Sequence, residues 1–404
     1  MPQTLSAPDT PPAPGRPWQP VLAGTLAACV GFAGSFAVVL QGLSGAGANA
    51  EQAASGLLAA AVACGLCGIV ISLYTRLPVA IAWSTPGAAL LATSGPADGG
   101  FAGGVGAFIM CAAGFIIAGL WRPFGAAVAA IPKHLASAML AGVLLGLCLA
   151  PVKAIAHYPL FGLCILAAWV VGALVNRLWA VPAALAAFAG TVVLGLDLPD
   201  GTAQSLQNTL TPPLVWITPH FSIEAFLSIS IPLFLVTMAS QNIAGIAVLT
   251  TFGYSPRPGP WIATTGLFSA LAAPFGCHAV NLAAITAAMC AGDDAHPDRD
   301  KRYWAAVWMG IGMIVLGLLS GAVIAFVVLA PPILIQAVAG LALVGAFSSA
   351  ALAAFEDPKT REASVVTFLF AASGITIAGI SGAFWGLLAG GAMSWAQARR
   401  RQEI

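Results

Sequence analysis

The chain contains two matching breaks in hydrophobic sequence, Trp83-Ser84-Thr85-Pro86-Gly87 and Ala273-Pro274-Phe275-Gly276-Cys277-His278, one in each half of its 404 residues. Each break combines proline with glycine, so each should free backbone N–H and C=O groups from helical hydrogen bonds. At membrane depth such groups are tolerated only where protein or a watery cavity satisfies them. Paired breaks therefore indicate a transport site at the interface of an internal repeat.

The composition is that of a polytopic membrane protein. Hydrophobic residues make up 59% of the chain and charged residues only 7%, whereas a soluble domain has about 25% charged residues. The 45 glycines suit close helix packing within a lipid bilayer. The net charge of +1 gives no indication of nucleic-acid binding.

The cysteines and charged loops give no sign of a metal site or a cofactor. All eight cysteines lie in apolar segments, and Cys64 and Cys67 are read as small buried residues because no histidine lies near them. The loop from Asp293 to Arg302 mixes both signs of charge and is interpreted as a solvated loop. An enzyme is disfavoured, since no nucleophile–base pair, metal cluster or phosphate loop is evident and no catalytic residue is assigned.

Hydropathy predicts an all-α fold with about 14 transmembrane segments in two groups of seven. The first group is predicted at 18–43, 52–74, 79–95, 101–121, 131–150, 154–176 and 180–196. The second is predicted at 222–251, 259–272, 274–291, 303–328, 331–351, 363–378 and 380–396. The remaining segments are a disordered N-terminal tail 1–17, a periplasmic linker 197–221 and a basic cytoplasmic tail 397–404.

The distribution of charge supports this topology. With the N-terminus inside, every one of the 15 lysines and arginines except Lys153 falls on the cytoplasmic side, as expected for cytoplasmic loops. Both termini are therefore predicted to be cytoplasmic. Every Asp and Glu falls in a loop, a tail or at a span end, so no carboxylate is expected at the midplane.

Internal similarity supports an inverted repeat. Pro132, Leu135, Ala138 and Ala141 at the start of the fifth span match Pro331, Leu334, Ala337 and Gly340 at the start of the twelfth. The stretch 39–45 likewise resembles 239–245. A repeat offset of seven spans, an odd number, places the second copy upside down in the membrane.

Local chemistry predicts short extended stretches before half-helices in spans 3 and 10. Residues 79–84 should be extended, with Thr85 as the N-cap and Pro86 at the first helical position. In the second break, Pro274 should open a half-helix that carries His278 and Asn281 on one face near its N-terminal end. The two helix N-termini would face one another and suit an anion such as a carboxylate.

Ten residues form the candidate substrate site. They are Ser84, Thr85, Gly87, Gln41, Gln241, Asn242, Phe275, Gly276, His278 and Asn281. Simple alternatives remain open: Ser84 and Thr85 as caps only, His278 as a buried histidine bonded to a carbonyl, and the Gln and Asn amides in helix-to-helix bonds. The aromatic rings of Phe36, Trp83 and Phe275 could line an apolar wall or simply pack.

Several motifs that recur in order resemble the benzoate/proton symporter family, BenE type. They are Val236-Thr237-Met238-Ala239-Ser240-Gln241-Asn242, Ala273-Pro274-Phe275-Gly276, Leu282-Ala283-Ala284-Ile285-Thr286-Ala287-Ala288 and Trp83-Ser84-Thr85-Pro86-Gly87, within a resemblance that runs from about 18 to 396. The family is similar to nucleobase and sulfate transporters with seven-plus-seven inverted repeats. The resemblance implies a core domain (18–121 and 222–328) that moves against a gate domain (131–196 and 331–396), often within a homodimer, in the bacterial cytoplasmic (inner) membrane.

The sequence departs from the nucleobase branch, which carries acidic residues where this chain has Gln241, Asn242 and the region from His278 to Asn281. Amides, hydroxyls and helix dipoles attract a carboxylate, whereas a glutamate would repel it. The resulting hypothesis is import of a small aromatic carboxylate, benzoate or a close analogue, with a proton, for which His278 is the candidate coupling group. The alternatives are a nucleobase/proton permease and a non-transporting membrane scaffold or receptor.

Overall fold

The computed structural model describes residues 16–129, 132–176, 179–195, 211–283, 285–321, 324, 329–377 and 380–402. Almost all of the predicted tail 1–17 and residues 197–210 of the predicted linker lie outside the described residues. The described elements are helices, with two short pairs of strands. The predicted all-α class is therefore confirmed.

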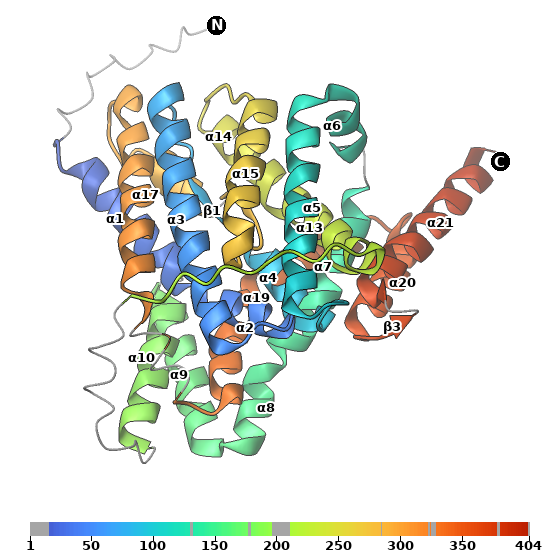
Figure 1. Ribbon diagram of the computed structural model, residues 1–404, viewed down its shortest axis with the longest axis horizontal. Helices are drawn as coiled ribbons and strands as arrows, with labels where there is room; N and C mark the ends of the chain where they lie inside the picture. Colours follow the sequence, from blue (N-terminus) through green and yellow to red (C-terminus); the bar gives the residue numbers. More distant parts are fainter. Residues whose placement is uncertain are drawn as a thin grey trace, which may run out of the picture.

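The first half begins with the interrupted pair α1 and α2 and the continuous helix α3. The strand β1 follows and leads into the short helix α4 (Figure 1). Its elements are α1 (Gln19–Ala33), α2 (Phe36–Gly45), α3 (Ala50–Thr75), β1 (Ile81–Trp83), α4 (Thr85–Ser94), α5 (Phe101–Leu120), α6 (Arg122–Ala129), α7 (Lys133–Cys148), α8 (Ala150–His157), α9 (Pro159–Val175) and α10 (Ala180–Gly195).

The second half repeats this order, with π-helical turns in its first long segment. Its elements are α12 (Ile223–Ala225), η2 (Phe226–Ser230), α13 (Ile231–Thr237), η3 (Met238–Asn242), α14 (Ile243–Thr251), α15 (Pro258–Ala272), η4 (Ala273–Phe275), β2 (Val280–Leu282), α16 (Ile285–Ala291), η5 (Arg299–Lys301), α17 (Tyr303–Leu318), α19 (Pro332–Phe355), α20 (Arg361–Ala372), β3 (Thr376–Ile377), β4 (Ile380–Ser381) and α21 (Gly382–Gln402).

Fewer helices than predicted are full-length spans. Within the described residues, six helical segments are long and apolar enough to cross a membrane by length and composition. They are Gln19–Gly45, Ala50–Thr75, Phe101–Leu120, Lys133–His157, Ile223–Thr251 and Pro332–Phe355. Others fall short because they are half-helices after strands, such as α4, or apolar helices of 17 and 16 residues, α9 and α10. The count of 14 spans stays a prediction.

One predicted boundary is wrong. The fifth span was expected to end at 150 and the sixth to begin at 154, but α8 continues α7 as far as His157. Leu149 between them keeps right-handed helical backbone angles of −81° and −15°. Pro151 lies in the first turn of α8, where its missing N–H leaves few helical bonds unmade.

The helices pack as two sets. In the first set, α3 and α1 pack on α17, α5 on α15, and α2 on α4; in the second, α7 packs on α19 and α20, α9 on α10, and α20 on α21. A separate buried apolar cluster, which includes Ile165, Phe188 and Leu334, joins α8, α9, α10 and α19. Figure 1 shows the second set displaced along the helix direction, so that α8, α9 and α10 extend beyond α2.

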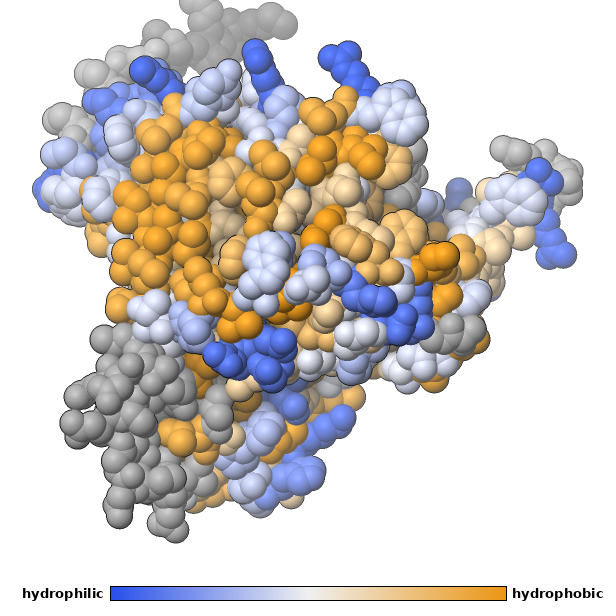
Figure 2. All heavy atoms as spheres, in the orientation of Figure 1, coloured by the Kyte–Doolittle hydropathy of each residue, from blue (hydrophilic) through white to orange (hydrophobic). Residues whose placement is uncertain are grey.

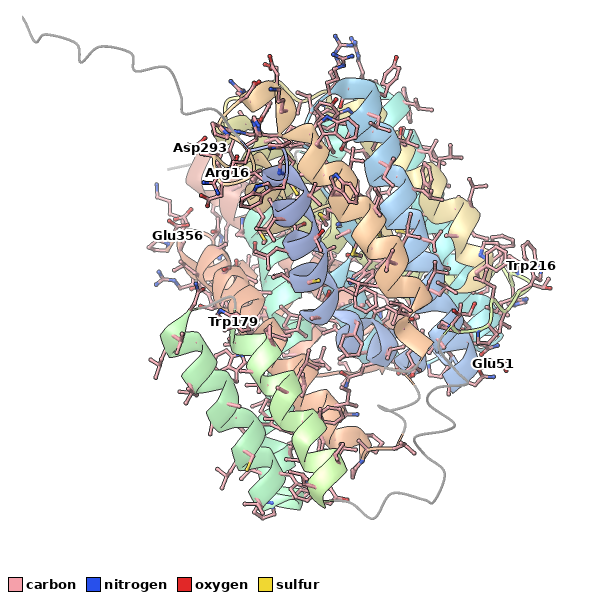
Figure 3. The ribbon with its side chains drawn as sticks, turned by 90° about the vertical axis from the view of Figure 1, so that its left-hand side faces the viewer. Arg16, Glu51, Trp179, Trp216, Asp293 and Glu356 are labelled. Atoms are coloured by element: carbon pink, nitrogen blue, oxygen red, sulfur yellow. The ribbon has the colours of Figure 1, made fainter. Side chains whose placement is uncertain are left out.

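The outer surface has the polarity expected of a protein in lipid. In Figure 2 hydrophobic side chains form a continuous area over α1, α3 and α17, bounded by hydrophilic residues at the ends of these helices. Figure 3 shows Arg16 and Asp293 at one end of the first set and Glu51 and Trp216 toward the other. We call the end that carries Arg16, Arg76 and Arg257 the basic end.

Glycine allows a close contact between α3 and α17 in the first set. A Cβ atom at Gly65 of α3 would lie 2.4 Å from the carbonyl oxygen of Gly310 in α17. A Cβ at Gly310 would lie 2.6 Å from the carbonyl oxygen of Gly65. Because these atoms belong to backbone, neither can move away without separating the helices.

We predict that Gly65→Ala lowers the free energy of unfolding by about 1–3 kcal/mol, the usual cost of overpacking. Gly146→Ala is the matched control, since a Cβ at Gly146 in α7 meets nothing within 4 Å. Thermal unfolding of the two purified variants in detergent measures the difference. Equal melting temperatures would contradict the tight contact.

Candidate functional site

The two breaks meet as a pair of hydrogen-bonded strands, β1 and β2, and we call this strand pair the crossing. β1 and β2 are antiparallel, with Ile81 opposite Leu282, Ala82 opposite Asn281 and Trp83 opposite Val280. Two further backbone bonds extend the pair, from Ser84 N to the oxygen of Ala279 (3.1 Å) and from Ala283 N to the oxygen of Ala80 (3.0 Å). Since the strands are antiparallel, α4 and α16 leave the pair in opposite directions and both N-termini point back toward it. The predicted extended stretches are confirmed.

The first half-helix is capped one residue earlier than predicted. Ser84, with extended backbone, is the N-cap, and its Oγ accepts a hydrogen bond from Gly87 N at 3.1 Å. Thr85 is already helical and Pro86 occupies the second helical position. The hydroxyl of Ser84 can reach the free N–H groups only because its own residue lies outside the helix. Gly87 has no room for a side chain: a Cβ there would lie 2.5 Å from Leu233 Cδ1.

The second break differs from its prediction. Pro274 lies in the single 3-10 turn η4, the chain then turns at Gly276, and α16 begins only at Ile285. Gly276 has φ of +95°, and a Cβ there would lie 3.0 Å from Gly56 Cα in α3. This left-handed turn ends the helix and releases the next residues to pair with β1. His278 therefore lies in the connection before β2 and Asn281 lies within β2, so the two do not share a helix face.

His278 joins the two breaks and keeps one ring nitrogen free. The residue is 1% exposed, and its Nε2 lies 2.9 Å from the carbonyl oxygen of Ser84. Because a carbonyl can only accept, Nε2 carries the hydrogen and donates it. The other nitrogen, Nδ1, is buried and has no hydrogen-bond partner among the described residues. The predicted bond to a carbonyl is present, but it involves only one of the two ring nitrogens.

The segment η3 lies along the strand pair and contacts both ends of it. Thr237, just before η3, is hydrogen-bonded through Oγ1 to Ser84 Oγ at 2.7 Å. Asn242, at the end of η3, accepts a bond from Leu282 N on Oδ1 at 3.0 Å. Asn242 is fully buried, and its amide supports the backbone of a strand rather than the helix-to-helix bond of the alternative. π-helical turns such as η3 occur frequently at functional sites.

The other predicted residues differ in their surroundings. Gln41 Oε1 in α2 and Asn281 Oδ1 in β2 are buried oxygens without partners among the described residues, and Gln241 is half-buried within η3. Phe275 and Gly276, by contrast, pack away from the crossing. The Phe275 ring meets Trp216 edge-on at 5.4 Å, and its carbonyl oxygen accepts from Ser55 Oγ of α3 at 2.9 Å.

The aromatic side chains Phe36 and Trp83 pack within the first set. The ring of Phe32 in α1 stacks on Phe36 at 6.0 Å and meets Trp83 edge-on at 5.3 Å. Trp83 Nε1 donates to Ser35 Oγ at 2.9 Å, at the break between α1 and α2. These contacts agree with the packing alternative for both residues.

A cavity of about 310 Å³ lies beside the crossing, between the two sets of helices. Its lining comes from α7, from the segment formed by α13, η3 and α14, and from α19 and α21. None of the ten predicted residues lines it, although Met238, Ala239 and Ser240 of η3 do. Sequence analysis missed Lys133 and Ser137 of α7, which also line it. Lys133 was counted only as a cytoplasmic charge, and its four-residue spacing to Ser137 was the available signal.

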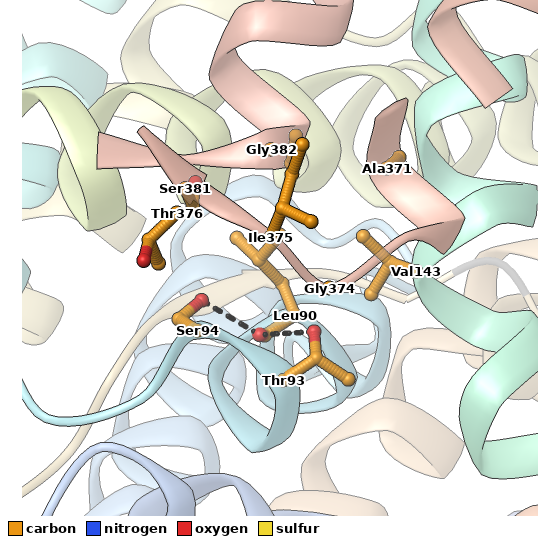
Figure 4. A pocket seen from close by; sticks show the side chains of 11 residues that line it. Leu90, Thr93, Ser94, Val143, Ala371, Gly374, Ile375, Thr376, Ser381 and Gly382 are labelled. Atoms are coloured by element: carbon orange, nitrogen blue, oxygen red, sulfur yellow. Dashed lines mark hydrogen bonds between the residues drawn. The ribbon is translucent and has the colours of Figure 1, made fainter. Parts of the chain in front are cut away.

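The opposite end of the same interface contains only a small void. A void of only about 10 Å³ lies between the C-terminal end of α4 and the connection from α20 to α21 (Figure 4). Ile375 and Thr376 face Ser94 and Leu90 there. Nearby, Ser381 Oγ of β4 donates to the carbonyl oxygen of Ser228 in η2 at 3.0 Å and joins the sets.

The charged loop after α16 is folded around one arginine and is less solvated than expected. Arg302 is 6% exposed, its Nε donates to the oxygen of His296 at 2.7 Å, and its Nη1 donates to that of Ala291 at 2.8 Å. Its Nη2 is paired with Asp293. Arg302 therefore satisfies a carbonyl at the end of α16, a role the mixed charges of the sequence did not predict.

Comparison with known proteins identifies relatives along nearly the whole chain. The family model described as benzoate membrane transport protein, BenE, matches residues 17–395. The inner membrane protein YdcO of Escherichia coli is 39% identical over 92% of this chain and 94% of its own length. The benzoate membrane transport protein of Acinetobacter baylyi is 31% identical over 91% of this chain and 92% of its own length.

Solved structures show the same fold at low identity. The transmembrane domain of a cyanobacterial bicarbonate transporter, BicA, superposes with a TM-score of 0.59 at 13% identity, over 89% of this chain and 99% of that one. The structure of SLC26A9 gives 0.59 at 14% identity, over 95% of this chain and 67% of that one. These likenesses concern the fold alone.

We predict that Ser84→Ala lowers the free energy of unfolding by about 1–2 kcal/mol, because it removes the N-cap of α4 and the bond to Thr237. Ser94→Ala is the control, since Ser94 Oγ bonds only the Leu90 carbonyl at the other end of the same helix. Thermal unfolding in detergent compares the two variants with the parent. Equal losses from both substitutions would show that the cap has no special role.

Proposed function

Because the chain belongs to the BenE family of benzoate membrane transport proteins, we propose that it carries an aromatic carboxylate, benzoate or a close analogue, across the inner membrane together with a proton. The single observation that supports an anionic substrate is the crossing of β1 and β2. There His278, whose Nδ1 is free, contacts the N-cap residue of α4, and no Asp or Glu is among the buried side chains of the described residues.

The chemistry of His278 links the proton to the anion. In its neutral form Nδ1 is an acceptor that has no partner, so it is the ring atom that would take up the proton. Once protonated, Nδ1 becomes a donor with positive charge and can bond a carboxylate oxygen. Proton and carboxylate then favour one another's binding, which is the requirement for symport.

The two sets of helices suit alternating access. We assign the predicted core domain, 18–121 and 222–328, to the moving part and the gate domain, 131–196 and 331–396, to the fixed part. The interface is open as a cavity of about 310 Å³ on the side of Lys133 and closed to about 10 Å³ at the other end. With the basic end in the cytoplasm, this arrangement is an inward-facing state. Whether two copies associate stays a prediction.

The rival functions lack matching features. A nucleobase permease would use an acidic side chain to hold the base, and the positions expected for it carry Gln241, Asn242 and Asn281. A scaffold or receptor has no need for the free buried polar atoms of His278, Asn281 and Gln41. Such atoms are costly to leave without partners unless a ligand completes them.

We predict that the purified protein in liposomes accumulates labelled benzoate when the interior is made alkaline. Excess unlabelled benzoate should abolish the signal, whereas uracil and xanthine should leave it unchanged. Competition by either nucleobase would favour the permease. Absence of uptake for all three compounds would favour a protein that does not transport.

We further predict that His278→Gln loses accumulation driven by the pH gradient but keeps benzoate exchange between the two sides at equal pH. Glutamine can still donate to the Ser84 carbonyl but takes up no proton. His157→Gln is the control, because His157 is exposed at the end of α8 and bonds only the Lys153 carbonyl. Full pH coupling in His278→Gln would exclude this role.

A further inference from the structure

The cavity between the two sets has the dimensions and lining of a small-molecule site. Its volume of about 310 Å³ lies at the lower end of the range of about 300–1,000 Å³ typical of ligand pockets. Most of its wall is apolar. The larger side chains are Leu140 of α7, Leu235 of α13, Ile243 of α14 and Leu387 of α21. Such a wall suits a ring better than a hydrated ion.

The polar groups of the cavity gather on one side of α7. Lys133 is the only charged residue among the described residues of its lining, and Ser137 follows one helical turn later on the same face. No carboxylate of the described residues lies within ion-pair distance of Lys133, and Ser137 Oγ has no hydrogen bond there either. Ser240 lies across from them, and its hydroxyl hydrogen is used by the Val236 carbonyl at 2.6 Å, so its oxygen is left to accept.

We propose that Lys133 and Ser137 form a second carboxylate site in this cavity, which holds the substrate between the crossing and the cytoplasm. This inference rests on the proposed function. The carboxylate bonds the Lys133 ammonium and the Ser137 hydroxyl, and the ring lies against Leu140 and Ile243. The stem of Lys133 can follow the apolar wall while its charge stays at the mouth of the cavity.

The place of this site in the fold gives it a separate role from the crossing. Thr237 and Asn242 contact the strand pair, whereas Met238, Ala239 and Ser240 of the same segment line the cavity. Lys133 belongs to the other set of helices. When the sets move against one another, Lys133 stays with α7 and the crossing moves with η3. The Lys133 site therefore receives the substrate as the crossing moves relative to α7.

Within the described residues, the Lys133–Ser137 site has no counterpart at the opposite end of the interface. In the repeat, Pro132 corresponds to Pro331, so the counterpart of Lys133 is the uncharged Pro332. The closed void at the other end has no charged residue in its lining. An anion is therefore held more strongly on the Lys133 side, and we expect the apparent affinities on the two sides of the membrane to differ.

The test measures benzoate transport in inside-out membrane vesicles, whose outer face is the cytoplasmic face. Lys133→Gln should raise the half-saturating benzoate concentration on this face roughly five- to tenfold, as expected for the loss of one partly solvated charge contact, with the maximal rate unchanged. Lys133→Arg should restore the parental value. Added salt should weaken benzoate binding by the parent and have little effect on Lys133→Gln.

Controls separate this site from a general effect of charge at the basic end. Lys301→Gln removes a lysine at that end whose ammonium lies 3.5 Å from Asp298, outside the cavity, and should behave as the parent. The proposal is overturned if Lys133→Gln leaves the half-saturating concentration unchanged, if Lys301→Gln raises it equally, or if the effect appears only in right-side-out vesicles. A parent that does not transport benzoate would instead refute the proposed function.

Discussion

The architecture depends on how two interrupted membrane segments satisfy their backbone groups. In lipid, an unpaired N–H or C=O costs several kcal/mol, so a chain that leaves its helix must find partners at once. Here each break supplies the partners of the other: β1 bonds to β2, and the bonds of Ser84 and Ala283 extend the ladder. Side chains complete it, since Asn242 bonds the Leu282 amide and His278 bonds the Ser84 carbonyl. The halves of the chain are thereby fixed to one another where the substrate is expected.

The sequence predicted those features that depend on composition and on proline. Pro86 correctly indicated the extended stretch before α4, and the matching breaks correctly indicated that two distant segments correspond. The second half-helix was misplaced by eleven residues because Pro274 is a good helix-starting residue by local criteria. What decides its conformation is the contact of Gly276 with Gly56 in α3, which no local pattern reveals. The Lys133 cavity was missed for the same reason, since its walls come from four separate segments.

The ten candidate residues include side chains that support backbone and side chains that keep a free buried atom. Their sequence motifs do not reveal this difference. Ser84 and Asn242 use their side chains to support backbone, and Phe275 packs against a loop. His278, Asn281 and Gln41 each retain a buried atom that no described residue satisfies. In a low-dielectric interior such atoms are stable mainly when something binds to them. Ser84 and Asn242 thus only support the crossing, whereas His278 both supports it and keeps one nitrogen free for a ligand.

The interlocking of the two halves affects how the protein can be made. The main partner of α3 is α17, that of α5 is α15, and that of α7 is α19, so these three helices of the first half each pack on one from the second. β1 likewise has its only strand partner, within the described residues, in β2. During synthesis these helices therefore enter the bilayer before their partners, and α3 lacks its main partner until α17, which begins at Tyr303, has been translated. Assembly of the two sets is therefore a late event in biogenesis, because α17 completes the first set and α19 to α21 complete the second only near the end of the chain.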